Sequence, residues 1–135
     1  MSMFSDFKLL EKHGFKLIPY RFATSEKESV EMANELKYPV AMKVISDEIS
    51  HKTDVGGVKI NLKNSISVKS AFNEIMSNTK RFNVKGVLIQ KMSRKGVELI
   101  VGGKKDVQFG HMIVLGLGGI YVEVFKDITA RICPI

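Results

Sequence analysis

The chain has 135 residues, of which 44% are hydrophobic and 26% charged, as is usual for a soluble globular domain with its own core. No apolar run approaches the roughly 18 residues of a membrane helix, and the N-terminus lacks the apolar core of a signal peptide. The single cysteine, Cys133, excludes an internal disulfide and a cysteine-based metal cage. We therefore expect a cytoplasmic protein without a membrane partner. The net charge of +7 favours anionic partners such as nucleotides, coenzyme A or phosphate, or else it reflects a solvated lysine-rich surface. The sequence contains no block of five or six like charges, so a nucleic-acid-binding tail is not indicated.

The first third of the sequence predicts two helices separated by a short extended segment. Residues 4–13 form a helical pattern, and Gly14 suits the left-handed conformation of a C-terminal cap. Residues 16–20 are extended, in part because proline disfavours helical backbone at the residue before it. The second helix begins at Ser25, which forms a capping-box pair with Glu28.

The middle third predicts two strands around a polar loop, followed by a helix. Residues 40–45 are a β-rich run, and residues 47–57 are polar and end in two glycines. Residues 58–62 alternate in polarity with a period of two, which is typical of a half-buried strand. A helix over residues 67–78 is predicted by apolar side chains at helical spacing, namely Val68, Ala71, Phe72 and Ile75.

The remainder of the chain predicts strands, at residues 86–92, 97–101, 111–115, 121–125 and 128–133. Alternating polarity in several of these segments favours mixed or antiparallel sheets with one solvated face. The predicted fold class is therefore α+β, with helices flanking the sheets.

Two common phosphate-binding motifs do not occur. A P-loop requires G-x-x-x-x-G-K-[ST], but Lys105 follows Gly103 and Lys104, and Glu98 stands where the first glycine belongs. A dinucleotide fingerprint requires G-x-G-x-x-G at the start of a helix. The segment 116–121 has no third glycine at that spacing, and a strand pattern follows it.

Lys43 lies inside the apolar run 39–45. A lysine in such a run either pairs with an anion or reaches solvent, because a buried bare ammonium is costly. Two interpretations stay open from the residues alone: an outward-facing lysine on a half-exposed strand, or a ligand for a phosphate group.

The segment 50–58 holds the densest group of chemically active side chains. Gly56 and Gly57 allow the backbone to approach a phosphate and to present its N–H groups, while Thr53 adds a hydroxyl and Lys52 a charge. His51 has the chemistry of a base, a ligand or a phosphoryl acceptor. The alternative is a polar hairpin loop in which glycine supplies the turn. The three histidines lack the spacing of a zinc motif, so we predict no metal ligands in this chain.

Several strings of residues, in order and at plausible spacing, resemble the ATP-grasp domain of the ADP-forming acyl-CoA synthetases (acetate–CoA ligases). They are Y-P-V-A-M-K-V at 38–44, the segment 50–58, G-V-L-I-Q-K-M at 86–92, E-L-I-V-G at 98–102, G-L-G-G-I at 116–120 and V-E-V at 122–124. The resemblance covers nearly the whole chain. It implies an ATP-grasp-like fold, with a first subdomain at about 20–92 and the start of a second at about 93–135.

The resemblance also implies a reaction. Enzymes of this kind interconvert acyl-CoA, ADP and phosphate with free acid, coenzyme A and ATP, through an acyl phosphate and a phosphohistidine. By resemblance, Lys43 contacts the nucleotide phosphates, His51 carries the phosphoryl group, the backbone of the hinge strand reads the adenine edge, and Glu98 lies where the nucleotide cleft closes. The implied nucleotide-binding residues are Lys43, Lys52, Thr53, Gly56, Gly57, Gln90, Lys91, Met92 and Glu98.

The sequence departs from the family pattern in two respects. Val107 and His111 stand where the family usually has proline. The family domain also continues beyond Pro134 into a segment that carries the magnesium ligands. We therefore expect a C-terminally truncated domain that is inactive alone, with its Mg²⁺ ligands elsewhere and a CoA-binding α subunit or domain as its partner. Strands left unpaired by truncation further predict a homo-oligomer.

Two other classes of function are alternatives. The first is a non-catalytic, stand-alone nucleotide-binding or interaction module derived from an ATP-grasp domain. The second is a nucleic-acid-binding domain that uses the basic residues Lys91, Arg94, Lys95, Lys104 and Lys105. No aromatic residue interleaves with these cations, and this argues against a stacking platform for bases.

Overall fold

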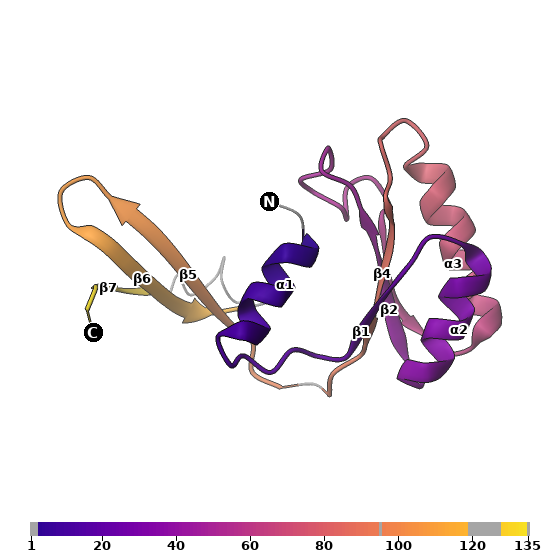
Figure 1. Ribbon diagram of the computed structural model, residues 1–135, viewed down its shortest axis with the longest axis horizontal. Coiled ribbons are helices and arrows are strands. Elements are labelled where there is room, and N and C mark those ends of the chain that lie inside the picture. The colour runs from indigo at the N-terminus through magenta and orange to yellow at the C-terminus, as the bar shows by residue number, and fades with distance from the viewer. Residues whose placement is uncertain (1–2, 95, 119–127, 135) are drawn as a thin grey trace. The chain divides into compact units, whose positions relative to one another are not determined.

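The computed structural model describes residues 3–94, 96–118 and 128–134, and the chain divides into two compact units, Met1–Ser93 and Arg94–Ile135. In the described part of the larger unit, three helices accompany a four-stranded sheet (Figure 1). Its elements are α1 (Met3–Lys12), β1 (Tyr20–Ala23), α2 (Glu26–Leu36), β2 (Val40–Ile45), β3 (Val58–Leu62), α3 (Ser65–Asn78) and β4 (Gly86–Lys91). The smaller unit contains β5 (Leu99–Asp106), β6 (Gly110–Leu117) and β7 (Ile128–Ile132). Every described strand pairing is antiparallel, so the α+β prediction is confirmed.

The two N-terminal helices lie where the sequence predicts them. Gly14 follows α1 with a φ of +82°, the left-handed conformation expected of a residue that ends a helix. Ser25 is the N-cap of α2, and its Oγ accepts a hydrogen bond from the Glu28 N–H at 3.2 Å. The Glu28 carboxylate in turn accepts from the Thr24 N–H at 2.7 Å, and this bond is the main cause of the lowered pKa of Glu28.

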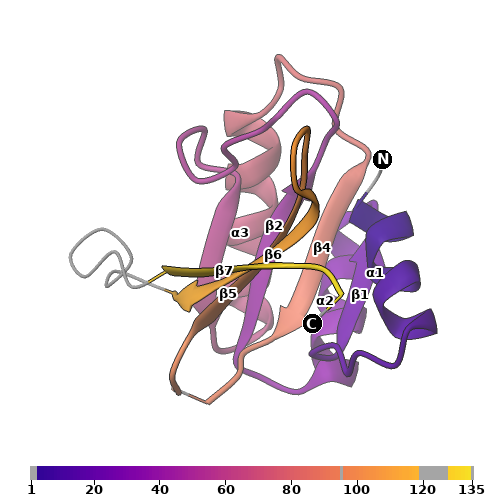
Figure 2. The same ribbon diagram turned by 90° about the vertical axis from the view of Figure 1, so that its left-hand side faces the viewer.

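The sheet of the larger unit has the strand order β1-β4-β2-β3, so β4 is a central strand although it comes last in this unit (Figures 1 and 2). α2 and α3 lie against one face of this sheet, and α1 lies on the other side beside β1 (Figure 1). Phe7 of α1 meets Tyr20 of β1 edge to face, with ring centroids 4.8 Å apart. The core between the sheet and the two helices includes Val40, Met42, Val44, Val87 and Ile89 from the central strands.

The helix α3 buries the apolar side chains that its sequence pattern predicts. Val68, Ala71, Phe72 and Ile75 are all buried. The helix begins two residues earlier than predicted because Asn64 is its N-cap, with Asn64 Oδ1 accepting from the Ser67 N–H at 2.9 Å.

The predicted alternation along β3 is wrong at one position. Leu62 is buried, but Ile60 is 65% exposed. The pairing of β3 with β2 shifts between Val40 and Met42, and Asn61 has a left-handed φ of +58°. An irregularity of this kind changes the face to which the following side chain points, so a simple period of two does not survive it.

The smaller unit is a three-stranded sheet in the order β5-β6-β7. β5 runs five residues further than predicted, through a glycine pair and two lysines to Asp106. The strand predicted at residues 121–125 lies outside the described residues. Paired positions place apolar side chains on both faces of this sheet: Leu99, Val101 and Leu115 on one, and Ile100, Val114 and Ile132 on the other.

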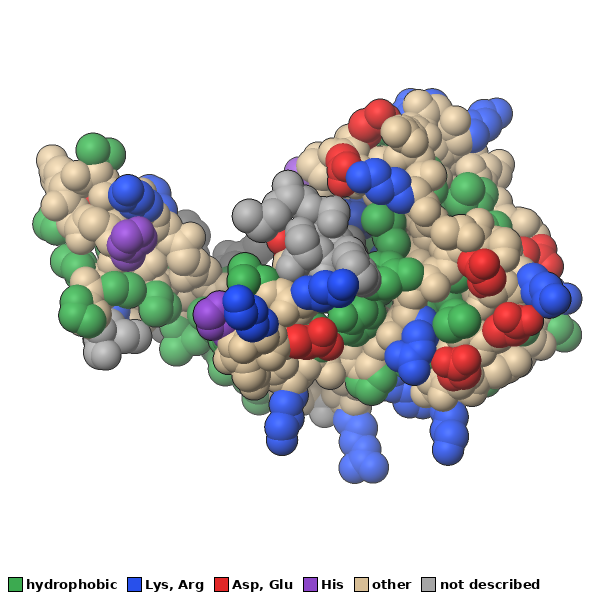
Figure 3. All heavy atoms as spheres, in the orientation of Figure 1, with side chains coloured by type: hydrophobic (Ala, Val, Ile, Leu, Met, Phe, Trp, Pro, Cys, Tyr) green, Lys and Arg blue, Asp and Glu red, His purple; other side chains and the backbone are tan. Residues whose placement is uncertain are grey.

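Two further observations concern the length of the described helices and the distribution of charge on the surface. No helix among the described residues is long and apolar enough to cross a membrane. On the face seen in Figure 3, basic and acidic side chains are interspersed over the region of α2 and α3. The basic net charge is thus not gathered into a single-sign patch on that face.

Candidate functional site

Lys43 lies on the face of the four-stranded sheet opposite α2 and α3, which we call the open face. Val40, Met42 and Val44 belong to the core beneath the helices, and successive residues of a strand point to opposite faces, so Lys43 points away from that core. Its side chain is half-buried. The sequence left a solvent-facing lysine and a phosphate ligand as alternatives, and this position is compatible with both.

Gln90 of β4 holds the Lys43 ammonium on the open face. Lys43 Nζ donates to Gln90 Oε1 at 3.1 Å, and the register places Ala41 opposite Gln90 and Lys43 opposite Leu88. An ammonium only donates hydrogen bonds, so the amide oxygen faces Lys43 and the NH₂ group of Gln90 is directed away from it. The partner is neutral, and the positive charge of Lys43 therefore remains uncompensated by it. The open face thus presents a fixed cation.

The Lys91 side chain lies on the other face of the sheet. Lys91 Nζ donates to the carbonyl of Tyr38 at 2.8 Å and also to that of Lys37, the C-cap of α2. A cation at this place stabilises the negative end of the helix dipole. The side chain of Lys91 is therefore occupied at α2, and only its backbone is available at the end of β4.

The backbone at the end of β4 is paired on both sides. The Lys91 N–H donates to the Pro19 carbonyl at 2.9 Å, and the Met92 N–H donates to the Pro39 carbonyl at 3.1 Å. The predicted hinge residues 90–92 thus form the final paired positions of a central strand.

The loop between β2 and β3 is anchored where it leaves β2. The Glu48 carboxylate accepts from the Asn83 N–H at 2.9 Å, and the Lys85 N–H donates to the Ile45 carbonyl at 2.8 Å. Lys85 Nζ also pairs with Asp47, and this hydrogen bond and charge lower the pKa of the Asp47 carboxyl. The first part of the loop is therefore tied to the segment that leads into β4.

The far end of the loop is closed by its two glycines. The Gly57 N–H donates to the Lys52 carbonyl at 2.8 Å, and the Gly56 N–H donates to the Thr53 carbonyl at 3.0 Å. Gly56 has a φ of +66°, and a Cβ at Gly57 would lie 2.6 Å from a methyl carbon of Val44. Glycine is thus required at both positions for backbone and packing reasons alone.

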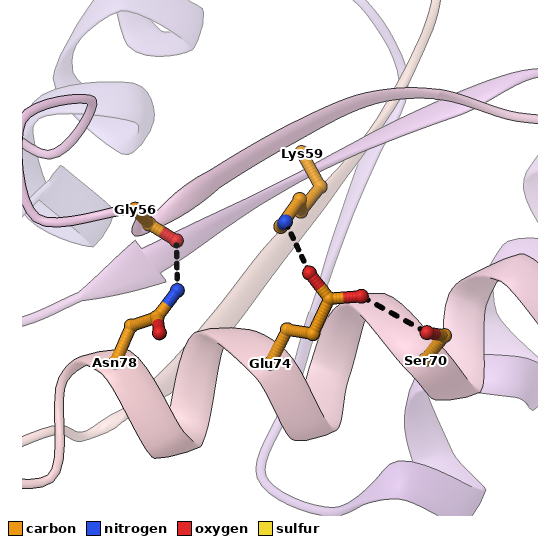
Figure 4. Close-up of polar contacts among 5 residues, drawn as sticks. All are labelled: Gly56, Lys59, Ser70, Glu74 and Asn78. Carbon is orange, nitrogen blue, oxygen red and sulfur yellow. Dashed lines mark hydrogen bonds and ion pairs between the residues drawn. The ribbon is translucent and has the colours of Figure 1, made fainter.

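The helix α3 supports this end of the loop (Figure 4). Asn78 Nδ2 donates to the Gly56 carbonyl at 3.4 Å. One turn earlier, Glu74 pairs with Lys59 of β3 and accepts from Ser70 Oγ at 3.0 Å, and these hydrogen bonds lower its pKa. A surface pocket of about 530 Å³ beside Gly56 is lined by Asp54, Val55, Gly56, Asn78, Lys80 and Arg81. Of the predicted nucleotide-binding residues, Gly56 lines this pocket, whereas Lys43 and His51 do not.

The remaining predicted residues fall into separate places. His51 and Thr53 are exposed and Lys52 is half-buried, within the stretch of loop between the two anchors. Glu98 belongs to the smaller unit, where its carbonyl accepts from the Gly118 N–H at 2.7 Å. A Cβ at Gly118 would lie 3.1 Å from that of Glu98, so this close pairing explains one glycine of the run 116–119. Gly119 lies outside the described residues.

From the predicted set, the structure brings Lys43 together with Gln90 and, separately, joins Lys52 and Thr53 to the two glycines of the loop. The contact between the Lys43 and Gln90 side chains was not predicted. Gln90 was assigned through its backbone, whereas its side chain is the partner of Lys43. The alternation in residues 86–92 carried part of the signal, because it places Gln90 on the face opposite Val87 and Ile89. The register between β2 and β4 is also needed to place the Gln90 side chain next to Lys43. Among the described residues, no group of three or more His, Cys, Asp or Glu side chains is placed to hold a metal ion.

Comparisons with known proteins agree on one family. A family model described as an ATP-grasp domain matches residues 2–135. The 4-hydroxybutyrate–CoA ligase (ADP-forming) of Nitrosopumilus maritimus is 46% identical over 132 residues, which cover 95% of this chain and 19% of that protein. The acetate–CoA ligase (ADP-forming) I subunit β of Pyrococcus furiosus is 42% identical over 132 residues, which cover 95% of this chain and 57% of that subunit.

A solved structure gives the same result. The dinucleotide-forming acetyl-coenzyme A synthetase 1 of Ca. Korarchaeum cryptofilum, in complex with coenzyme A and Ca-AMPCP, matches this chain with a TM-score of 0.93 and 37% sequence identity. The match covers 100% of this chain and 61% of that one. This chain therefore spans less than two thirds of each of these relatives.

Proposed function

This chain belongs to the ATP-grasp domain family, and from that premise we propose that the open face of its four-stranded sheet binds the phosphates of ADP or ATP. The observation that supports this most directly is the Lys43 ammonium, held on that face by the neutral Gln90 side chain at 3.1 Å. A cation fixed by an uncharged partner keeps its charge for an anion, and it loses little side-chain entropy when the anion binds.

The base of the nucleotide is assigned to the end of β4. Residues 90–92 end a central strand whose backbone groups are fixed by pairing on both sides, and Gln90 links this backbone to Lys43. A rigid strand is a better platform for reading a base edge than a free loop, because the positions of its donors and acceptors are set in advance. Lys52 and Thr53 are assigned to the phosphates from the loop side. The predicted role of Gly56 and Gly57 as phosphate donors is not proposed again, because their N–H groups already donate to the Thr53 and Lys52 carbonyls within the turn.

The two units are assigned to the two subdomains of an ATP-grasp fold. The first subdomain comprises about residues 20–92 of the larger unit, and the smaller unit is the start of the second subdomain. Glu98 and the adjoining glycines are the contribution of the smaller unit to nucleotide binding. No residue of this chain is proposed as a ligand for Mg²⁺.

The activity proposed for the whole protein is that of an ADP-forming acid–CoA ligase. The relatives are ligases of this class, and this chain corresponds to part of their length. In the proposed reaction an imidazole nitrogen of His51 attacks the phosphorus of the acyl phosphate, the bond between that phosphorus and the acyl oxygen breaks, and the free carboxylate leaves. A terminal oxygen of the ADP β-phosphate then attacks that phosphorus, the N–P bond breaks, and ATP and neutral histidine result. A CoA-binding α subunit or domain supplies the acyl-group chemistry.

Binding of ADP by Lys43 variants tests the site. Lys43→Ala is expected to weaken ADP binding by about 1.5–3 kcal/mol, the value of a hydrogen bond to a charged group. Lys69→Ala on the exposed surface of α3 is the matched control, because it removes the same charge far from the open face. Isothermal titration calorimetry on the two variants measures the difference. Equal losses in both variants would show that Lys43 contributes only to net charge, and the open face would not be the phosphate site.

A further inference from the structure

The surface pocket of about 530 Å³ beside Gly56 is separate from the site proposed on the open face. It is lined by the end of the loop between β2 and β3, by the end of α3 and by the residues that follow that helix. Lys80 and Arg81 are its basic residues, and Asp54 is its acidic residue. A concave site with an excess of positive charge favours an anionic ligand.

The two cations are not needed to cap α3. Basic side chains near the C-terminus of a helix can hydrogen-bond its last carbonyls, as Lys91 does at the end of α2. At the end of α3 this role belongs to Thr79, whose N–H and Oγ1 donate to the Ile75 carbonyl at 3.0 and 2.6 Å. Among the described residues, neither Lys80 nor Arg81 donates to a helix carbonyl or pairs with a carboxylate.

The Arg81 guanidinium is held by the aromatic ring of the next residue. Its Cζ lies 4.8 Å from the centroid of the Phe82 ring, and Phe82 packs against the core of the larger unit. Such a contact uses the flat face of the guanidinium and leaves the N–H groups at its edge available. These N–H groups form the fork that binds two oxygens of one phosphate group. Lys80 supplies a second cation beside it.

The other lining residues give the pocket a fixed base and a further donor. Val55 is half-buried and packs against the core, so the base of the pocket is in place before a ligand binds. Asn78 Nδ2 donates to the Gly56 carbonyl at 3.4 Å, and an amide nitrogen carries a second N–H that can serve a ligand (Figure 4). Asp54 is exposed, and its negative charge opposes the binding of an anion.

We propose that this pocket binds a phosphate group, either free or as part of a phosphomonoester, with Arg81 and Lys80 as the principal donors. Its volume is in the range of small-molecule sites, so it also has room for the organic part of a monoester. The site is distinct from the one assigned to the phosphates of ADP or ATP, because Lys43 does not line it.

Titration of the chain with inorganic phosphate tests this site. Every sample carries Lys43→Ala, so that Lys43 on the open face does not contribute. The amide NMR signals of Gly56 and Asn78 are expected to shift as phosphate binds. Arg81→Gln should weaken binding about five- to tenfold, as for the loss of a charge-assisted hydrogen bond. Arg81→Lys keeps the charge without the fork and should lose less, whereas Asp54→Asn removes a like charge and should bind phosphate more tightly.

A matched control and a second ligand complete the test. Lys69→Gln removes one positive charge from the exposed surface of α3, outside the pocket, and should leave phosphate affinity unchanged. Tighter binding of AMP than of phosphate would identify a phosphomonoester as the ligand, and AMP binding no tighter than phosphate would identify free phosphate. Equal weakening by Arg81→Gln and Lys69→Gln would overturn the proposal, as would Gly56 and Asn78 signals that respond to neither compound. Neither result would bear on the open face, since Lys43 is absent from every sample.

Discussion

Lysine residues of this chain have different roles that depend on the face to which each one points. Lys43 is held by a neutral amide on the open face, whereas Lys91, on the opposite face of the neighbouring strand, stabilises the C-terminal end of α2. Lys59 pairs with Glu74 of α3, and Lys85 pairs with Asp47 at the start of the loop. Lys59 and Lys85 are neutralised by carboxylates and Lys91 is held at the end of α2, whereas Lys43 is held on the open face by a neutral side chain, and this makes it the strongest candidate of the four to bind an anionic ligand.

His51 gives a prediction about catalysis. In the complete enzyme, rebuilt from the full domain and its partner, His51→Ala is expected to abolish phosphoryl transfer to ADP while acyl phosphate formation continues, because that step uses the partner's site. Trapping the phosphorylated protein and assaying ATP formation measure the two steps separately. His13→Ala and His111→Ala are controls, since both histidines are exposed outside the loop, and both variants should retain activity. Near-normal ATP formation by His51→Ala would leave His51 a loop residue.

The pair between Lys59 and Glu74 gives a prediction about pH. The folded-state pKa of Glu74 is lowered, first by its hydrogen bond to Lys59, so the contact stabilises the fold above the unfolded-state pKa of about 4.3 and is lost as the pH falls through the lower folded-state value. Urea unfolding should therefore show Glu74→Gln to be less stable than the unmodified chain at pH 7, with the difference shrinking below about pH 4. Glu31→Gln on exposed α2 is the control, with a small effect throughout. A Glu74→Gln difference that stays constant down to pH 3 would contradict the assignment.

Among the elements, α3 connects the core to the loop. Its buried side chains pack beneath the sheet, while Asn78 and Glu74 reach the loop and β3 (Figure 4). The loop that carries His51 is thus positioned by a helix as well as by its own glycine turn. A loss of helix packing would consequently affect both the fold and the proposed phosphate site.

Ile75→Ala tests this connection. Ile75 is fully buried, so its truncation is expected to cost about 2–5 kcal/mol in the free energy of unfolding, from lost burial and from the cavity that remains. Ile66 lies on the same helix but is 76% exposed, and Ile66→Ala should change stability by less than about 0.5 kcal/mol. Chemical denaturation followed by circular dichroism measures both values. Comparable effects of the two substitutions would mean that α3 does not pack as described.

At the scale of the whole molecule, the two units differ in how much apolar surface they cover. The larger unit buries its core between the sheet and two helices, whereas Leu99, Val101 and Ile132 of the smaller unit are 61%, 70% and 48% exposed. Among the described residues, exposed apolar side chains thus lie on both faces of this three-stranded sheet, and contiguous apolar surface of this kind favours association. We propose that this sheet associates with another chain.

Association through this sheet is expected to depend on concentration. The purified chain should form a dimer or higher oligomer in light scattering at micromolar concentrations. The double substitution Val101→Glu and Leu115→Glu, which places charges on one face of the sheet, should shift it toward the monomer. Ile66→Glu, at an exposed site on α3, is the control and should not. A monomer across the whole concentration range would argue against this interface.

Local pattern by itself determined most of the helices and strands and the family resemblance. The capping residue Ser25, the glycine after α1, and the apolar spacing along α3 act over a few residues, and the structure confirms all three. The strings around Lys43 and residues 86–92 also carried the family, which the comparisons confirm.

The contacts that depend on the register of paired strands could be determined only from the tertiary structure. The pairing of Lys43 with Gln90 joins residues 47 positions apart, and the prolines opposite Lys91 and Met92 are far from them in sequence. The shift in pairing between β2 and β3 brings Leu62 opposite Val40 of the core, whereas Ile60 stays exposed. Strand order and register set which side chains and backbone groups meet, and they depend on contacts across the whole sheet that no local pattern specifies.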